Sequence, residues 1–100
     1  KIYITLGNLK LAETSLREAI KIKPNNPAAL NNLGEVLREC GDLNESEACI
    51  RKAISLKKDY YIAYNNLSKL AIIFDRLDEA KEYARKAIDL NPDYEDSYAK

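Results

Sequence analysis

Apolar residues recur at helical spacing in short stretches that are separated by turn-forming residues. After Asn26-Pro27, Leu30, Leu33 and Leu37 follow at the i, i+3, i+7 spacing that places side chains on one face of a helix. Further stripes of this kind cover residues 43–56, 61–73 and 77–90. The pattern predicts an all-α chain built of helices of about a dozen residues, with no strand signal.

Capping and breaking residues predict where these helices begin and end. Asn26 before Pro27 is typical of a helix start, because the asparagine can cap it and a proline at the first helical position loses no hydrogen bond. Gly41 can adopt the left-handed conformation that ends the first helix. Asp42 and Glu45 have the spacing of a capping box for the next helix. Further breaks are expected at Asp75, which takes the place of Gly41 one unit later, and at Pro24 and Pro92.

The sequence repeats itself with a period of 34 residues. Residues 27–60 and 61–94 are identical at thirteen of 34 aligned positions, including Asn31-Asn32-Leu33 against Asn65-Asn66-Leu67. We therefore divide the chain into a partial repeat (1–26), two full repeats (27–60 and 61–94) and the start of another (95–100). In this division residues 1–6 are the end of a first helix, and Gly7 is the turn equivalent to Gly41. A single helical hairpin cannot bury its apolar face, so neighbouring repeats must stack into one array.

These residues resemble the tetratricopeptide repeat (TPR) family over the whole chain. The family pattern of a bulky residue, then Leu-Gly, then an aromatic residue or leucine is met by Leu30, Leu33-Gly34 and Leu37. The small and bulky residues typical of its second helix are present as Ser46, Ile50, Ala53, Ala80, Ala84 and Ala87. The resemblance implies a right-handed superhelical solenoid of antiparallel helix pairs.

A second face of each repeat's first helix is left over after stacking. In the family this face lines a concave groove that takes extended peptides or partner helices, and the resemblance assigns that role to equivalent positions here. The candidate peptide-binding residues are Asn31, Asn32, Glu35, Arg38, Glu39, Ile62, Asn65, Asn66, Lys69, Ile72 and Ile73.

Asn32 and Asn66 occupy positions at which the repeat arrays of O-GlcNAc transferase-like proteins carry an asparagine ladder. Because an amide side chain both donates and accepts hydrogen bonds, such a column could bind a peptide main chain without reading its sequence. The alternative is that these asparagines bond locally or to water. A carboxylate clamp, as in chaperone-tail-binding members, fits poorly: Asn66 and Lys100 suit it, but Asn31, Glu35 and Asp96 do not.

Composition and charge exclude several other functions. Sixteen basic and sixteen acidic residues cancel, which argues against nucleic acid and against an anionic membrane as partners. No apolar run is long enough to span a bilayer. With no histidine and only Cys40 and Cys49 as thiols, the chain offers no triad and no zinc site, and its three glycines form no phosphate loop. We expect no cofactor and no catalysis, and we expect half-buried helical thiols in a reducing, cytoplasmic setting.

The leading hypothesis is therefore a non-catalytic protein–protein interaction scaffold. Two alternatives stay open at this point: a substrate-presenting segment of a larger enzyme such as a glycosyltransferase, and a purely architectural spacer. Incomplete repeats at both ends of the sequence also raise the prospect of end-to-end self-association.

Overall fold

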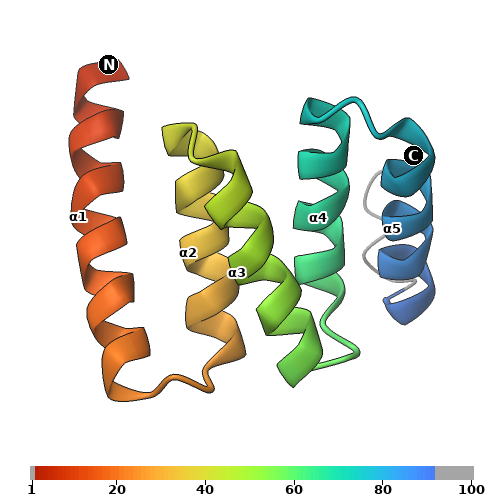
Figure 1. The fold of residues 1–100 in the computed structure, drawn as a ribbon, viewed down its shortest axis with the longest axis horizontal. Coiled ribbons are helices and arrows are strands. Elements are labelled where there is room, and N and C mark those ends of the chain that lie inside the picture. Colours follow the sequence, from red (N-terminus) through yellow and green to blue (C-terminus); the bar gives the residue numbers. More distant parts are fainter. Residues whose placement is uncertain (1, 92–100) are drawn as a thin grey trace.

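The computed structural model describes the backbone of residues 2–91 and the side chains of residues 7–91. The described part is all-helical, with α1 (Ile2–Ile22), α2 (Pro27–Cys40), α3 (Leu43–Leu56), α4 (Tyr61–Ile73) and α5 (Leu77–Leu90). Figure 1 shows the helices as a row that starts with α1 and ends with α5. Each helix packs against the next one in the chain, and α2 also approaches α4. The predicted fold class, a solenoid of helical hairpins, is confirmed; the expected start of a further repeat at 95–100 lies outside the described residues.

Most of the predicted helix ends are confirmed. Asn26 caps α2, since its side-chain oxygen accepts a hydrogen bond of 3.2 Å from the Ala29 amide, and Pro27 is the first helical residue. Gly41 ends the same helix in the left-handed conformation with φ of 96°. Asp75 replaces it one repeat later with φ of 62°, which aspartate tolerates better than most residues.

The capping box predicted for α3 is wrong. Asp42 is the N-cap residue, but its side chain makes no capping hydrogen bond. Glu45 instead accepts a hydrogen bond of 2.9 Å from Arg17 of α1, so its carboxylate is directed toward the neighbouring repeat. An ion pair with a facing helix has displaced the local interaction that the sequence spacing favoured.

The turn expected at Gly7 is not formed either. α1 is one helix from Ile2 to Ile22, and it passes through Gly7 without a break. Glycine permits a left-handed turn but does not impose one, and each residue that continues a helix gains a backbone hydrogen bond.

The core lies between the two hairpins. Ile50 of α3 and Ala63, Leu67 and Leu70 of α4 form its buried centre, with Phe74 packed against it. Within the α2–α3 hairpin, a Cβ atom on Gly34 would collide with the side chain of Ile50, so only glycine allows the observed approach of these helices. Gly34 therefore sets the spacing between α2 and α3.

Candidate functional site

Several charged side chains of α1 and α3 form ion pairs with one another. Arg17 of α1 donates hydrogen bonds of 3.0 Å to Glu13 and 2.9 Å to Glu45 of α3. These bonds, the one to Glu45 first, raise the pKa of Arg17 further. The bond to Glu45 links α1 to α3 through their side chains.

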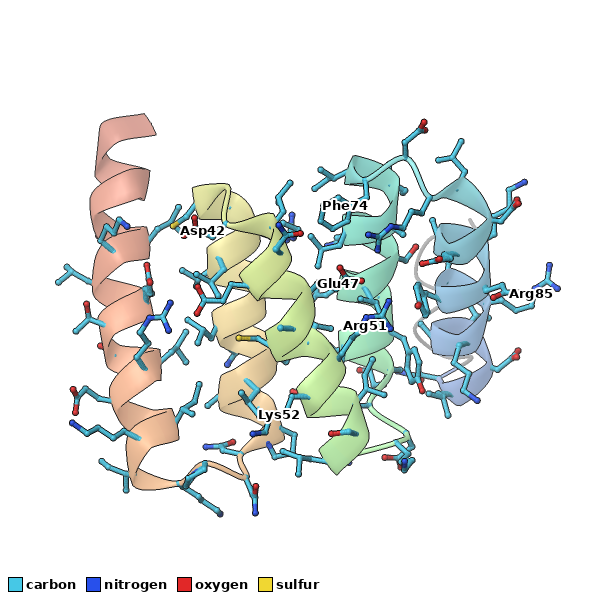
Figure 2. All side chains as sticks on the ribbon, in the orientation of Figure 1. Asp42, Glu47, Arg51, Lys52, Phe74 and Arg85 are labelled. Atoms are coloured by element: carbon cyan, nitrogen blue, oxygen red, sulfur yellow. The ribbon has the colours of Figure 1, made fainter. Side chains whose placement is uncertain are left out.

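The same arrangement recurs one repeat later around Glu47 and Arg51. Arg51 donates to Glu47 at 2.8 Å and to the Tyr83 hydroxyl of α5 at 3.0 Å, while Arg76 donates to Glu47 at 2.9 Å. Figure 2 shows Glu47 and Arg51 projecting from α3 toward the α4–α5 hairpin. Burial alone would raise the pKa of Glu47, but the hydrogen bonds from Arg51 and Arg76 outweigh it and hold this pKa below its ordinary value.

The candidate residues of α2 and α4 form a different kind of surface. Six of these candidate residues reach solvent and form one stripe on each of the two helices. We call these two stripes the first-helix face; its residues are Asn32, Glu35, Glu39, Ile62, Lys69 and Ile73. Ile62 and Ile73 are 42% and 51% exposed. Glu35, Glu39, Lys69 and the adjacent Arg38 form no ion pair with the side chains of residues 7–91. The first-helix face thus carries unpaired charges and exposed isoleucines. Among the second helices, most charges of α1 and α3 are paired, whereas α5 forms no ion pair with the described side chains.

Asn31 and Asn66 do not belong to this solvent-facing surface. Both are almost fully buried, and the Asn66 side-chain amide donates a hydrogen bond of 3.0 Å to the Asn31 side-chain oxygen across α2 and α4. The expectation that Asn32 and Asn66 project equivalently from their helices is therefore wrong for Asn66. The two asparagines differ because they have different neighbouring helices. Asn66 is covered by α2, the first helix of the preceding repeat, whereas no first helix lies beside Asn32 among the described residues. Asn65 is half-buried and has its own polar contact.

Ile72 lies elsewhere, at the α5 end of the array. It lines an apolar cavity of about 320 Å³ together with side chains of α4 and α5, namely Ser68, Leu77, Ala80, Lys81 and Ala84. One repeat earlier the equivalent surface of α2 and α3 is covered by α4. At the opposite end α1 exposes Leu11 (70%) and Ile22 (83%). End-to-end self-association stays a prediction, and these are the two surfaces it would use.

A polar cleft of about 450 Å³ between α1 and the α2–α3 turn was not found from the sequence. Its lining combines residues of α1 with those of the turn: Glu13, Arg17, Gly41, Asp42, Leu43, Asn44 and Glu45. Glu13, Glu45 and Arg17 of this lining are already paired with one another, and the Arg17–Glu45 pair joins α1 to α3. The periodicity of Glu13 and Arg17, repeated as Glu47 and Arg51, was the only signal in the sequence that could have revealed it.

In the part of the chain that the structure describes, the thiols and the remaining polar groups give no sign of a metal centre or a reactive site. Cys40 and Cys49 are half-buried and unpaired, as expected. Burial, with Glu45 nearby, raises the pKa of the Cys49 thiol and so disfavours its reactive thiolate. Within residues 7–91 no group of three His, Cys, Asp or Glu side chains could hold a metal ion. The described helices include none with the length and apolar character needed to cross a membrane.

Comparison with known proteins decides the family. Residues 26–93 match the family model described as tetratricopeptide repeat, and residues 1–37 match one described as TPR repeat. The chain belongs to the tetratricopeptide repeat family. Domains of this family are typically non-catalytic and mediate protein interactions. The comparison with curated proteins found no match.

Among solved structures, this TPR chain is similar to the first TPR domain of Spaghetti (RPAP3) bound to the HSP90 peptide SRMEEVD. The TM-score is 0.82 at 21% sequence identity, over 90% of this chain and 71% of the other. At this identity the likeness demonstrates the shared fold.

Proposed function

We propose that this TPR chain is a non-catalytic scaffold that holds an extended segment of a partner protein along the first-helix face. The observation that carries the proposal is the pair of exposed isoleucines, Ile62 and Ile73, on the first-helix face. The charges on the same face, Glu35, Glu39 and Lys69, form no ion pair with the described side chains and are available to a ligand.

The chemistry of this face suits a peptide. Ile62 and Ile73 each leave about half of their surface in water, and covering apolar area stabilises a complex by about 25 cal/mol per Å². Asn32 is exposed and offers both a donor and an acceptor to a peptide main chain. Glu35, Glu39 and Lys69 then lie where they can select the side chains of the bound segment.

The structural neighbour supports this proposal in a general way, because it is a TPR domain that binds a peptide. The O-GlcNAc transferase-like asparagine ladder loses support, since the chain exposes Asn32 but buries Asn66. A substrate-presenting role within a larger enzyme would use the same face and is a special case of the proposal. A purely architectural spacer would bind no peptide at all.

A random display library of twelve-residue peptides tests the proposal, because such a library samples segments of every side-chain chemistry. We expect peptides to be enriched on the folded chain and to bind the isolated protein in fluorescence anisotropy. Ile73→Asp should weaken them about tenfold or more, because it places a charge in an apolar contact. Ile22→Asp is the matched control, since Ile22 is also exposed but lies on α1. Failure to enrich any peptide, or equal losses in both variants, would contradict the proposal.

A further inference from the structure

The two ends of the helical row expose apolar side chains. Among the described residues seven large apolar side chains are exposed, and four of them lie at these ends: Leu11 and Ile22 on α1, and Ile72 and Leu77 beside α5. Figure 1 shows α1 and α5 at opposite ends of the row. Apolar surface that is exposed to water gains stability when a second surface covers it.

On α1 the exposed apolar residues belong to one stripe, in which residues follow one another at steps of four, three and four. We call it the outer α1 stripe; its residues are Leu11, Ser15, Glu18 and Ile22. All of them are exposed, whereas Leu9, Leu16 and Ile20 on the opposite side of the helix are half-buried toward α2. The Glu18 carboxylate forms no ion pair with the described side chains.

α5 carries a stripe with the same three steps. We call it the outer α5 stripe; its residues are Leu77, Lys81, Ala84 and Ile88. The first three line the apolar cavity at this end of the row, and Ile72 of α4 borders it. Ile88 is half-buried. Lys81 has no acid within ion-pair distance among the described side chains.

The two stripes match in every layer when the helices run antiparallel. The layers are Leu11 with Ile88, Ser15 with Ala84, Glu18 with Lys81, and Ile22 with Leu77. Steps that alternate between four and three residues are those of helices that pack side by side along a seam. Parallel packing would set Glu18 against Ala84 and Lys81 against Ser15, so both charges would lose water without a countercharge.

Neither charge is what the repeat provides at these positions. One repeat later the position of Glu18 holds Lys52, and one repeat earlier the position of Lys81 holds Glu47. Likewise Leu11 is apolar where α3 has Glu45. The complementarity of the two outer stripes therefore comes from residues in which α1 and α5 differ from α3.

We propose that the chain binds a second copy of itself head to tail, through the outer α1 stripe of one protomer and the outer α5 stripe of its partner. Glu18 pairs with the partner's Lys81, and this ion pair sets the register and the antiparallel direction. Because the two stripes lie at opposite ends of the row, the contact does not close, and further copies extend the row. No residue of the first-helix face belongs to either stripe, so this inference is independent of the proposed peptide binding.

The size of the contact sets the concentration at which it forms. One helix packed on a hairpin end buries less than the roughly 1,200 Å² at which stable complexes begin. We therefore expect a dissociation constant of about 0.1–1 mM. Sedimentation equilibrium of the purified chain between about 0.01 and 2 mM covers this range, and the average mass should rise past that of a dimer.

Charge reversal tests the register. Glu18→Lys and Lys81→Glu should each weaken association about tenfold or more, because like charges then meet in the seam. The double variant keeps the net charge of the wild type and should associate like it, since the ion pair is restored in the opposite sense. Glu82→Lys is the control, because it makes the same change as Glu18→Lys on an exposed part of α5 outside the stripe.

Three results would overturn the inference: a monomer at every concentration, a mass that stops at the dimer, or a double variant that associates no better than the single variants. All of the substituted side chains are exposed, so the variants should keep the circular dichroism of the wild type. A monomeric wild-type chain that still binds library peptides would reject the head-to-tail contact and leave the peptide scaffold standing.

Discussion

Each full repeat has a serine whose hydroxyl donates a hydrogen bond across its helical hairpin. The serine lies on the second helix in one repeat and on the first helix in the other. In the α2–α3 hairpin, Ser46 donates to the carbonyl of Gly34. In the α4–α5 hairpin the equivalent positions hold Ser68 and Ala80, and Ser68 donates to the carbonyl of Ala80 at 2.8 Å. Each hairpin thus joins one serine to one smaller residue at its closest approach. The hairpin therefore requires a serine opposite a smaller residue, and either helix can carry the serine.

The consequence for Gly34 can be measured. A Cβ atom there would meet Ile50 and the carbonyl of Ser46, so we expect Gly34→Ala to destabilise the chain by about 1–3 kcal/mol. Gly7 is the matched control, because it lies within α1 with open space around its Cα. Gly7→Ala should stabilise by up to about 1 kcal/mol through helix propensity. Urea unfolding followed by circular dichroism measures both, and a stabilised Gly34→Ala would contradict the packing described.

The two equivalent asparagines should also differ in how much their replacement affects stability. Asn66→Ala removes the donor to Asn31 and leaves a buried amide without that partner, which should cost about 1–3 kcal/mol. Asn32→Ala changes an exposed side chain and should alter stability by less than about 0.5 kcal/mol. Thermal unfolding of the two single variants gives the comparison. Equal stabilities would mean that the interhelical amide bond contributes nothing.

At the scale of whole elements, α3 is the helix that joins the repeats. It is linked to α1 through Glu45 and to the α4–α5 hairpin through Glu47 and Arg51. Glu47 accepts from arginines on two segments, Arg51 of its own helix and Arg76 before α5. Protonation of this one carboxylate would weaken both contacts.

The lowered pKa of Glu47 gives the sign of the pH dependence. The pKa is lower in the folded state, so the stabilisation is complete above the unfolded value and is lost as the pH falls through the folded value. Glu47→Gln should therefore cost about 1 kcal/mol near pH 7, as for a surface ion pair, and much less near pH 3. Urea midpoints at the two pH values test this, with Glu82→Gln on the exposed side of α5 as control. A cost that does not shrink in acid would contradict it.

Helix boundaries were predictable where a single local rule decides them. Asn26, Pro27 and Gly41 act through their own backbone and nearest neighbours, and all three behave as the sequence indicates. Asp42 and Glu45 had the right spacing for a capping box, but Arg17 competes for Glu45 from 28 residues away. Gly7 matched Gly41 in the alignment, and α1 nevertheless continues through it. A local pattern cannot include what a residue distant in the sequence does to it.

For the molecule as a whole, the period of 34 residues was enough to predict the hairpins and the face that remains after stacking. It could not distinguish residues that are equivalent in sequence but have different neighbours. Asn66 lies against α2 and is buried, whereas Asn32 is exposed. Likewise Ile72 is exposed at a cavity beside α5, while its equivalent Arg38 is half-buried. The position of a repeat within the array therefore decides the role of its side chains.

The same dependence on position predicts where the array opens first. No residue of α1 from 7 to 22 is buried, while α2 and α4 each contain six buried residues. α1 contacts α2 and is tied to α3 by the Arg17–Glu45 pair, which is exposed and contributes at most about 1 kcal/mol. Because repeat arrays gain stability from interfaces between neighbours, α1 should open while α2 to α4 remain folded.

In native-state hydrogen exchange, amides of residues 9–20 should be less protected than those of Leu33–Leu37 and Leu67–Ala71. Arg17→Gln should lower protection in α1 further and leave α4 unchanged. Equal protection in α1 and α4 would show instead that the described helices unfold as one unit.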